Sequence, residues 1–182
     1  MKSDLRNMPV YAAVNDQETL EHMGFRLQIL AATQPGKPAL HDGQQSWSWA
    51  MLVSEVNRIA NRLREQGLST GDTVAGLSEN SLEYVALYLG VVTAGGCMVP
   101  LSGMASGEAL ALMINDCDAR FLFVSQKNQA LFNDARDNLA NVPAEHCIGL
   151  GVPLSDSGLS LQSWLGEASD AGNPAPVTLD DA

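Results

Sequence analysis

The residues best suited to bind a phosphate group in this 182-residue chain form a short Gly-Lys motif. A phosphate loop needs several backbone N–H groups to converge on the ligand, and glycine allows the main chain to approach that closely. Here Gly36 and Lys37 are followed by Pro38 instead of Ser or Thr, and Ala31 stands where such a loop has its first glycine. We therefore interpret Gly36-Lys37 as a turn.

A second glycine motif follows a predicted strand near the C-terminus. Gly149 and Gly151 supply half of the glycine fingerprint with which dinucleotide-binding enzymes hold a pyrophosphate, but Leu154 occupies the third glycine position. A dinucleotide-dependent oxidoreductase is an alternative that rests on these two glycines alone.

Histidines that could act as general bases or bind a metal are far apart in the sequence. None has a second histidine four positions away or stands in a cysteine-and-histidine set with metal-ligand spacing. No Gly-x-Ser-x-Gly motif marks a nucleophilic serine. The residue types and spacings therefore predict no catalytic group and no metal site. The histidines are His22, His41 and His146.

The three cysteines, Cys97, Cys117 and Cys147, are an odd number, and their spacings of 20 and 30 include no Cys-x-x-Cys motif. They fit neither a disulfide framework nor a zinc site. Cys97 and Cys147 fall in apolar predicted strands, so we expect reduced thiols packed in the core. Because the N-terminus also lacks the apolar stretch of a signal peptide, we place the protein in the cytoplasm.

The composition excludes several classes of protein. Ten Lys and Arg against 21 Asp and Glu give a formal net charge of −11, which argues against a nucleic acid or an anionic membrane bound through a basic surface. With 46% hydrophobic residues, most of the chain is not expected to be disordered. No apolar run approaches the ~18 residues that a membrane span requires.

Three arginines interrupt this acidic character on one predicted helix. Arg58, Arg62 and Arg64 project from the side of the helix that also carries Glu55 and Glu65. A solvated helix face with internal ion pairs is the ordinary interpretation of such a pattern. A phosphate-binding patch is the alternative.

The periodicity of apolar residues predicts the elements that would position any site. An amphipathic helix over 19–34 precedes two short strands at 38–41 and 46–49, which flank the turn dipeptide Asp42-Gly43, and a helix over 50–66 follows. Short apolar runs then alternate with helices, which indicates a mostly parallel sheet with helices on both faces. The predicted class is α/β with a short N-terminal hairpin. The helices of this part are 81–93, 107–115 and 129–140, and the strands begin near 73, 97, 120 and 146.

Two polar residues follow strands of this predicted sheet. Asn80 and Ser102 stand after strand carboxyl ends, where open α/β sheets place their ligands, so they are candidate cofactor-binding residues. The structural alternatives are that Asn80, with Glu83 three residues on, caps the following helix and that Ser102 belongs to a turn. Capping also explains the hydroxyl of Ser81, which begins that helix. The helix after Asn80 is predicted to bury Leu82, Val85, Ala86, Leu89 and Val92.

Five motifs stand in order along the chain: SWAML at 48–52, GDTV at 71–74, NSLE at 80–83, TAGGCMVPL at 93–101 and SGEAL at 106–110. Together they resemble the N-terminal part of the adenylate-forming enzymes, the superfamily of acyl-CoA synthetases, aryl-CoA ligases, luciferases and peptide-synthetase adenylation domains. Because all five occur in the same order over ~90 residues, chance is a poor explanation of the similarity.

The resemblance implies a function for a longer protein. It implies the acyl-CoA synthetase-like fold, ATP, Mg²⁺ and CoA as cofactors, and a small carboxylic acid as substrate. In the family, the phosphate loop follows a segment like that before Ala182. We therefore expect residues 1–150 to form an N-terminal subdomain, 151–182 to form an acidic linker, and the rest of the parent chain to be the partner.

The 182 residues alone are expected to be inactive scaffold. They would leave apolar faces unpartnered, which favours self-association. A stand-alone, non-catalytic α/β binding or assembly module is the alternative function.

Overall fold

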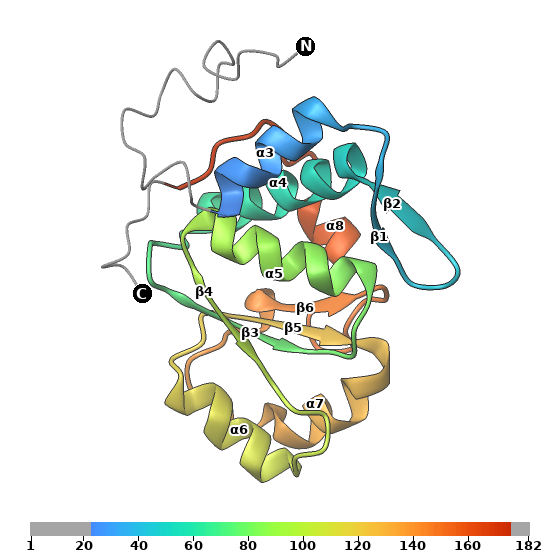
Figure 1. Ribbon diagram of the computed structural model, residues 1–182. Helices are drawn as coiled ribbons and strands as arrows, with labels where there is room; N and C mark the ends of the chain where they lie inside the picture. Colours follow the sequence, from blue (N-terminus) through green and yellow to red (C-terminus); the bar gives the residue numbers. More distant parts are fainter. Residues whose placement is uncertain (1–22, 176–182) are drawn as a thin grey trace.

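The computed structural model describes residues 23–175 (Figure 1). Its centre is a four-stranded parallel sheet in the order β4-β3-β5-β6, which confirms the predicted class. The strands are β3 (Thr73–Leu77), β4 (Cys97–Pro100), β5 (Phe121–Ser125) and β6 (Cys147–Leu150).

Helices cover both faces of this sheet. Figure 1 shows α3 (Met23–Thr33), α4 (Trp49–Glu65), α5 (Leu82–Ala94) and α8 (Leu161–Leu165) above the sheet, and α6 (Gly107–Asp116) and α7 (Gln129–Arg136) below it. Two separate apolar clusters correspond to these two layers. The arrangement follows from right-handed crossovers, because β3 leads to β4 on one side while β4 leads back across β3 to β5.

The N-terminal hairpin also matches the sequence pattern. Strands β1 (Pro38–His41) and β2 (Ser46–Ser48) pair in antiparallel fashion, and the carboxylate of Asp42 accepts the amides of Gln44 and Gln45 in the turn. Ser48 then caps α4 by accepting the amide of Met51. The two strands therefore begin where the sequence predicts them, and α4 begins at Trp49, one residue before its predicted start. The first four residues of the predicted helix over 19–34 lie outside the described residues.

Helix α5 decides between two predicted capping residues and corrects one burial expectation. Its N-cap is Ser81, whose hydroxyl accepts the amide of Tyr84, so the cap lies one residue after Asn80. The helix is also buried on most of its circumference, because it lies between the sheet and α4. The predicted single apolar face therefore holds for Leu82 and Ala86, whereas Val85, Leu89 and Val92 are half-buried.

Other boundaries and one burial prediction differ from the sequence analysis. Helix α7 ends at Arg136 instead of residue 140, and Asn115 of α6 bonds the carbonyl of Asn138 and the amide of Ala140 beyond that end. Cys97 is exposed, because it begins β4 at the edge of the sheet. Cys147, in β6, is buried as predicted, and burial raises the pKa of its thiol to about 12.

Residues 151–175 differ most from expectation, because the predicted linker is packed against the rest of the fold. Leu161, Trp164 and Leu165 of α8 are each at most 3% exposed. After α8, residues 166–175, which we name the strap, run along α4 (Figure 1). The strap ends with the amide of Ala175 donating to the carbonyl of Thr93 on α5.

Polar side chains of α4 hold the strap. Asn57, which is 4% exposed, donates to the carbonyl of Asp170 at 2.9 Å, and its side-chain oxygen accepts from Gln28 at 2.7 Å. One turn later, Asn61 donates to the carbonyls of Ser169 and Ala171. The amides of α4 thus bind the backbone of a segment that carries no secondary structure of its own.

Replacing Asn57 should loosen this attachment. In Asn57→Ala, the carbonyl of Asp170 and the amide of Gln28 lose their partner in a mostly buried place, so the free energy of unfolding should fall by ~2 kcal/mol. Urea denaturation followed by far-UV circular dichroism measures this. Asn61→Ala, at a more exposed site, is the matched control and should cost less than ~1 kcal/mol. Equal costs for the two variants would contradict the assignment.

The cap of α5 can be tested by a second pair of variants. Ser81→Ala removes the side chain that accepts the amide of Tyr84, so it should lower stability by ~1 kcal/mol. Asn80→Ala should change stability by no more than a few tenths of a kcal/mol, since the exposed Asn80 is outside the cap. Thermal denaturation of both variants distinguishes the two positions, and a greater loss for Asn80→Ala would show the cap to be wrong.

Candidate functional site

The sheet topology defines where a ligand site is expected. The connections from β3 and β5 run in opposite directions, β3 to the outer strand β4 and β5 to the outer strand β6. In open α/β sheets, ligands bind at the carboxyl ends of the two strands where the direction changes. In this chain that place lies beyond Leu77 and Val124, which are paired near the ends of β3 and β5.

A carboxylate and two polar side chains meet at this edge. Glu79, two residues beyond β3, accepts a hydrogen bond from the Ser125 hydroxyl at 2.7 Å and one from the Asn128 amide at 3.2 Å. Asn128 also donates to the Ser125 hydroxyl at 2.9 Å. Ser125 is 6% exposed, whereas Glu79 is exposed. We name these three residues the switch-point cluster.

The chemistry of the switch-point cluster argues against a phosphate site at this edge of the sheet. The hydrogen bond from Ser125 is the main reason that the pKa of the Glu79 carboxyl lies below its usual value, and Lys127 contributes a smaller lowering. A carboxylate held ionised opposes the negative charge of a phosphate. The residues of this cluster therefore do not fit the phosphates of ATP, and we derive no catalytic step from them.

The two residues predicted as candidates, Asn80 and Ser102, follow the neighbouring pair of strands, β3 and β4. Asn80 lines an apolar pocket of about 420 Å³ together with Tyr84, Val85, Tyr88, Leu89 and Pro100. Ser102 is exposed, and its hydroxyl accepts the amide of Met104 at 3.3 Å, which is the turn role considered as its alternative. Ser102 is not among the residues that line the Asn80 pocket. The structure places the two candidates after adjacent strands without joining them in one site.

The sequence analysis missed the switch-point cluster, although its residues satisfy the rule that ligands bind at strand carboxyl ends. Glu79 and Ser125 both stand at strand carboxyl ends, as Asn80 and Ser102 do. The rule selects strand ends, but only the order β4-β3-β5-β6 tells which two ends are at the change of direction. That order depends on long-range pairing that no local pattern reveals.

The half fingerprint at Gly149 has a packing explanation. A β-carbon at Gly149 would overlap the carbonyl oxygen of Val152, so the glycine allows the chain to fold back closely after β6. Gly151 has a positive φ of 85°, which suits the turn that follows. Both glycines are thus accounted for by the backbone, which leaves the dinucleotide alternative without further support.

The described histidines make structural contacts. A ring nitrogen of His41 bonds the carbonyl of Gln45 at the hairpin, and His146 bonds the carbonyl of Arg120 and stacks on Phe121. His22 lies outside the described residues. Within residues 23–175, no three His, Cys, Asp or Glu side chains are grouped so that they could hold a metal ion. In the same range, no helix is both long and apolar enough to cross a membrane.

The switch-point cluster predicts a measurable titration. Ser125→Ala removes the hydrogen bond that favours the ionised form of Glu79, so the pKa of Glu79 should rise towards its ordinary value of 4.5. Because the folded-state pKa is lowered, the stabilisation is present above the ordinary pKa and is lost as the pH falls through the folded-state pKa. Carbon-detected NMR titration of the Glu79 carboxyl measures the shift. An unchanged pKa in Ser125→Ala would contradict the assigned cause.

Comparisons with known proteins place this geometry in a family. The family model described as AMP-binding enzyme matches residues 27–181. The chain is 30% identical over 122 residues to crotonobetaine/carnitine–CoA ligase of Salmonella paratyphi A, covering 66% of this chain and 23% of that protein. It is 32% identical over 118 residues to the hybrid PKS-NRPS synthetase pydA of Acremonium sp, covering 64% of this chain and 3% of that protein.

Solved structures show the same fold. The anthranilate CoA ligase AuaEII, determined in complex with anthranoyl-AMP, superimposes with a TM-score of 0.79 at 24% identity and covers 88% of this chain. This chain spans 30% of AuaEII, and so corresponds to less than a third of each of these relatives. Since the family model matches most of the chain, including the sheet, α4 and the strap, the protein belongs to the family of AMP-binding enzymes.

Proposed function

We propose that this chain forms the N-terminal structural portion of an adenylate-forming acid–thiol ligase. The observation that carries the proposal is the continuous match of the AMP-binding family model from residue 27 to residue 181. That range includes the hairpin, the whole parallel sheet and the strap. The similarity to a CoA ligase and to a hybrid PKS-NRPS synthetase supports an enzyme that activates a carboxylic acid.

The reaction of the complete enzyme has two steps in this proposal. A carboxylate attacks the α-phosphate of ATP, giving an acyl-adenylate and pyrophosphate. The thiol of CoA then attacks the acyl carbon, forming a thioester and releasing AMP. CoA is proposed over a carrier-protein thiol because a CoA ligase, crotonobetaine/carnitine–CoA ligase, is among the relatives at 30% identity. ATP would be used with Mg²⁺, and the protein is proposed to work in the cytoplasm on a small carboxylic acid.

In this proposal the described residues serve as scaffold and take no part in the chemical steps. Developing negative charge on the phosphates must be offset by converging N–H groups, cations or both. The carboxyl edge of the sheet instead carries Glu79, whose oxygens already accept two hydrogen bonds. We therefore assign the described part of the chain to scaffold, with Asn80 and Ser102 kept as proposed contacts to cofactor or to further polypeptide. Self-association of the isolated chain through its exposed apolar side chains is part of the same proposal.

ATP–pyrophosphate exchange tests the division of roles. The 182-residue chain should give no exchange with a panel of aliphatic and aromatic acids, because the carboxyl edge of the described sheet carries the ionised Glu79 instead of converging donors for the triphosphate. A longer polypeptide read from the same gene should exchange with at least one acid of the panel. Exchange by the 182 residues alone would overturn the scaffold assignment, and a gene that stops at residue 182 would favour the non-catalytic module.

A further inference from the structure

Two of the three arginines on α4 are committed to holding the C-terminal segment. Arg58 donates to the carbonyl of Gly166 at 2.9 Å, and Arg62 donates to the carbonyl of Trp164 at 2.8 Å. The guanidinium of Arg62 also lies 5.9 Å from the centre of the Trp164 ring. Each of the two arginines forms an ion pair with a glutamate of its own helix. Their positive charges are therefore compensated within the fold.

Arg64 has no such compensation. Its guanidinium is half-buried and donates to the side-chain oxygen of Asn61 at 2.7 Å. Within residues 23–175, no carboxylate oxygen lies within 4 Å of it. A guanidinium has five N–H donors, so most of those on Arg64 have no acceptor among residues 23–175. Burial also lowers the pKa of Arg64, in keeping with a charge partly removed from water.

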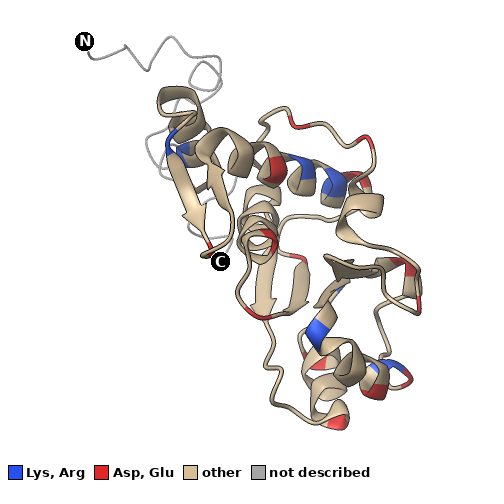
Figure 2. Ribbon diagram, turned by 90° about the vertical axis from the view of Figure 1, so that its right-hand side faces the viewer, with Lys and Arg blue, Asp and Glu red and all other residues tan. Residues whose placement is uncertain are grey.

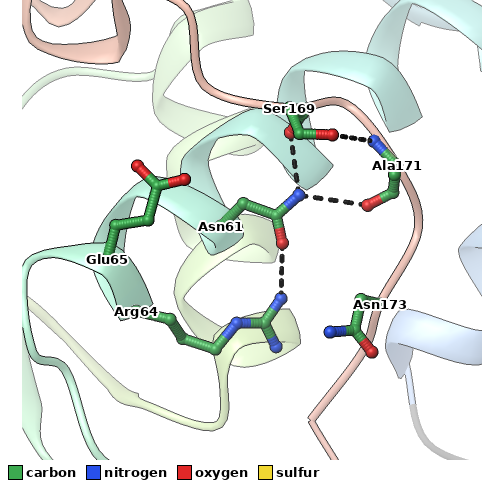
Figure 3. Close-up of a pocket in the computed structure, with 6 residues that line it drawn as sticks. All are labelled: Asn61, Arg64, Glu65, Ser169, Ala171 and Asn173. Atoms are coloured by element: carbon green, nitrogen blue, oxygen red, sulfur yellow. Dashed lines mark hydrogen bonds between the residues drawn. The ribbon is translucent and has the colours of Figure 1, made fainter.

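The side chain of Arg64 lines a pocket of about 570 Å³ between α4 and the strap (Figure 3). Figure 3 shows the amide nitrogen of Asn173 directed towards the guanidinium of Arg64, and the side chain of Glu65 turned away from it. The amide nitrogen of Asn61 is occupied by carbonyls of the strap. The pocket is lined by Asn61, Arg64, Glu65, Ser169, Ala171 and Asn173.

We propose that this pocket binds a small oxyanion of the phosphate type between Arg64 and Asn173. The planar guanidinium donates two parallel N–H bonds to such an anion, and the amide of Asn173 supplies a donor from the opposite side. Figure 2 shows positively and negatively charged residues close together on α4, in keeping with the ion pairs that Arg58 and Arg62 form with glutamates of the same helix. Since the net charge of −11 repels anions, we expect binding at this pocket and not over the general surface.

Phosphate titration of the full 182-residue chain tests the site. Inorganic phosphate is added at constant ionic strength, with chloride as the balancing anion, and NMR amide shifts are followed. The unaltered chain should show saturable shifts in Arg64 and the strap, with a dissociation constant in the millimolar range. Arg64→Gln should weaken binding at least tenfold. Absence of saturable shifts in the unaltered chain, or equal affinity in Arg64→Gln, would overturn the proposal.

Lys127→Gln is the matched control, because it removes one positive charge from an exposed position that neither lines the pocket nor holds the strap. It should retain the affinity within twofold, and a loss as great as that of Arg64→Gln would show a general charge effect and overturn the site. Circular dichroism confirms that each variant is folded before titration.

Asn173→Asp provides a test in the opposite direction. It places a carboxylate opposite the guanidinium, so it should raise the melting temperature while abolishing phosphate binding. Unchanged phosphate affinity in Asn173→Asp would overturn the proposed geometry. Glycerol phosphate, titrated alongside, distinguishes the source of the anion. Affinity similar to that of inorganic phosphate assigns the site to a phosphoryl group carried by a larger molecule, and a tenfold loss assigns it to the free ion.

Discussion

The close packing of α4 on α5 is the contact on which the rest of the structure depends. A β-carbon at Gly90 of α5 would lie 2.6 Å from Cγ2 of Ile59 on α4, so the two helices can approach this closely only with glycine at that position. Ile59 is fully buried in the apolar cluster between these helices and the sheet. Helix α5 is thereby covered on two sides, which explains why burial extends around most of its surface.

The position of α4 in turn organises segments far from it in the sequence. Its N-terminal end follows the hairpin, and the amide of Trp49 donates to the carbonyl of Lys37. Its outer side offers Asn57 and Asn61 to the backbone of the strap, more than 100 residues later. The same helix therefore binds both the hairpin and the strap, and the strap brings Ala175 to the carboxyl end of α5.

Features set by neighbouring residues could be predicted from the sequence. The turn at Asp42-Gly43, the amphipathic pattern of α4 and the apolar strands depend on local chemistry, and the structure confirms them. The exposure of Cys97 could not be predicted, because it depends on β4 being an edge strand. The N-cap of α5 is Ser81 and not Asn80. Both are good capping residues, and only the path of the backbone selects Ser81.

Local sequence patterns could not predict the strap or the switch-point cluster, because both depend on residues far apart in the chain. The composition of residues 151–175 is typical of a linker, and its attachment arises from side chains of Asn57 and Asn61 on the distant α4. The switch-point cluster likewise joins Glu79 to Ser125, 46 positions apart, through the pairing of β3 with β5. Polar residues whose partners lie far along the chain are the ones that a sequence pattern interprets as solvated surface.

Native-state hydrogen exchange tests the central claim, that residues 151–175 are part of the folded unit held by α4, most directly. The account predicts slow exchange of the Trp164 amide, which donates to Ser160, and of the Ala175 amide, which donates to Thr93. Their opening free energies should approach that of Phe123 in the centre of the sheet. Exchange of both amides at the rate of an unstructured peptide, with Phe123 still protected, would contradict the account.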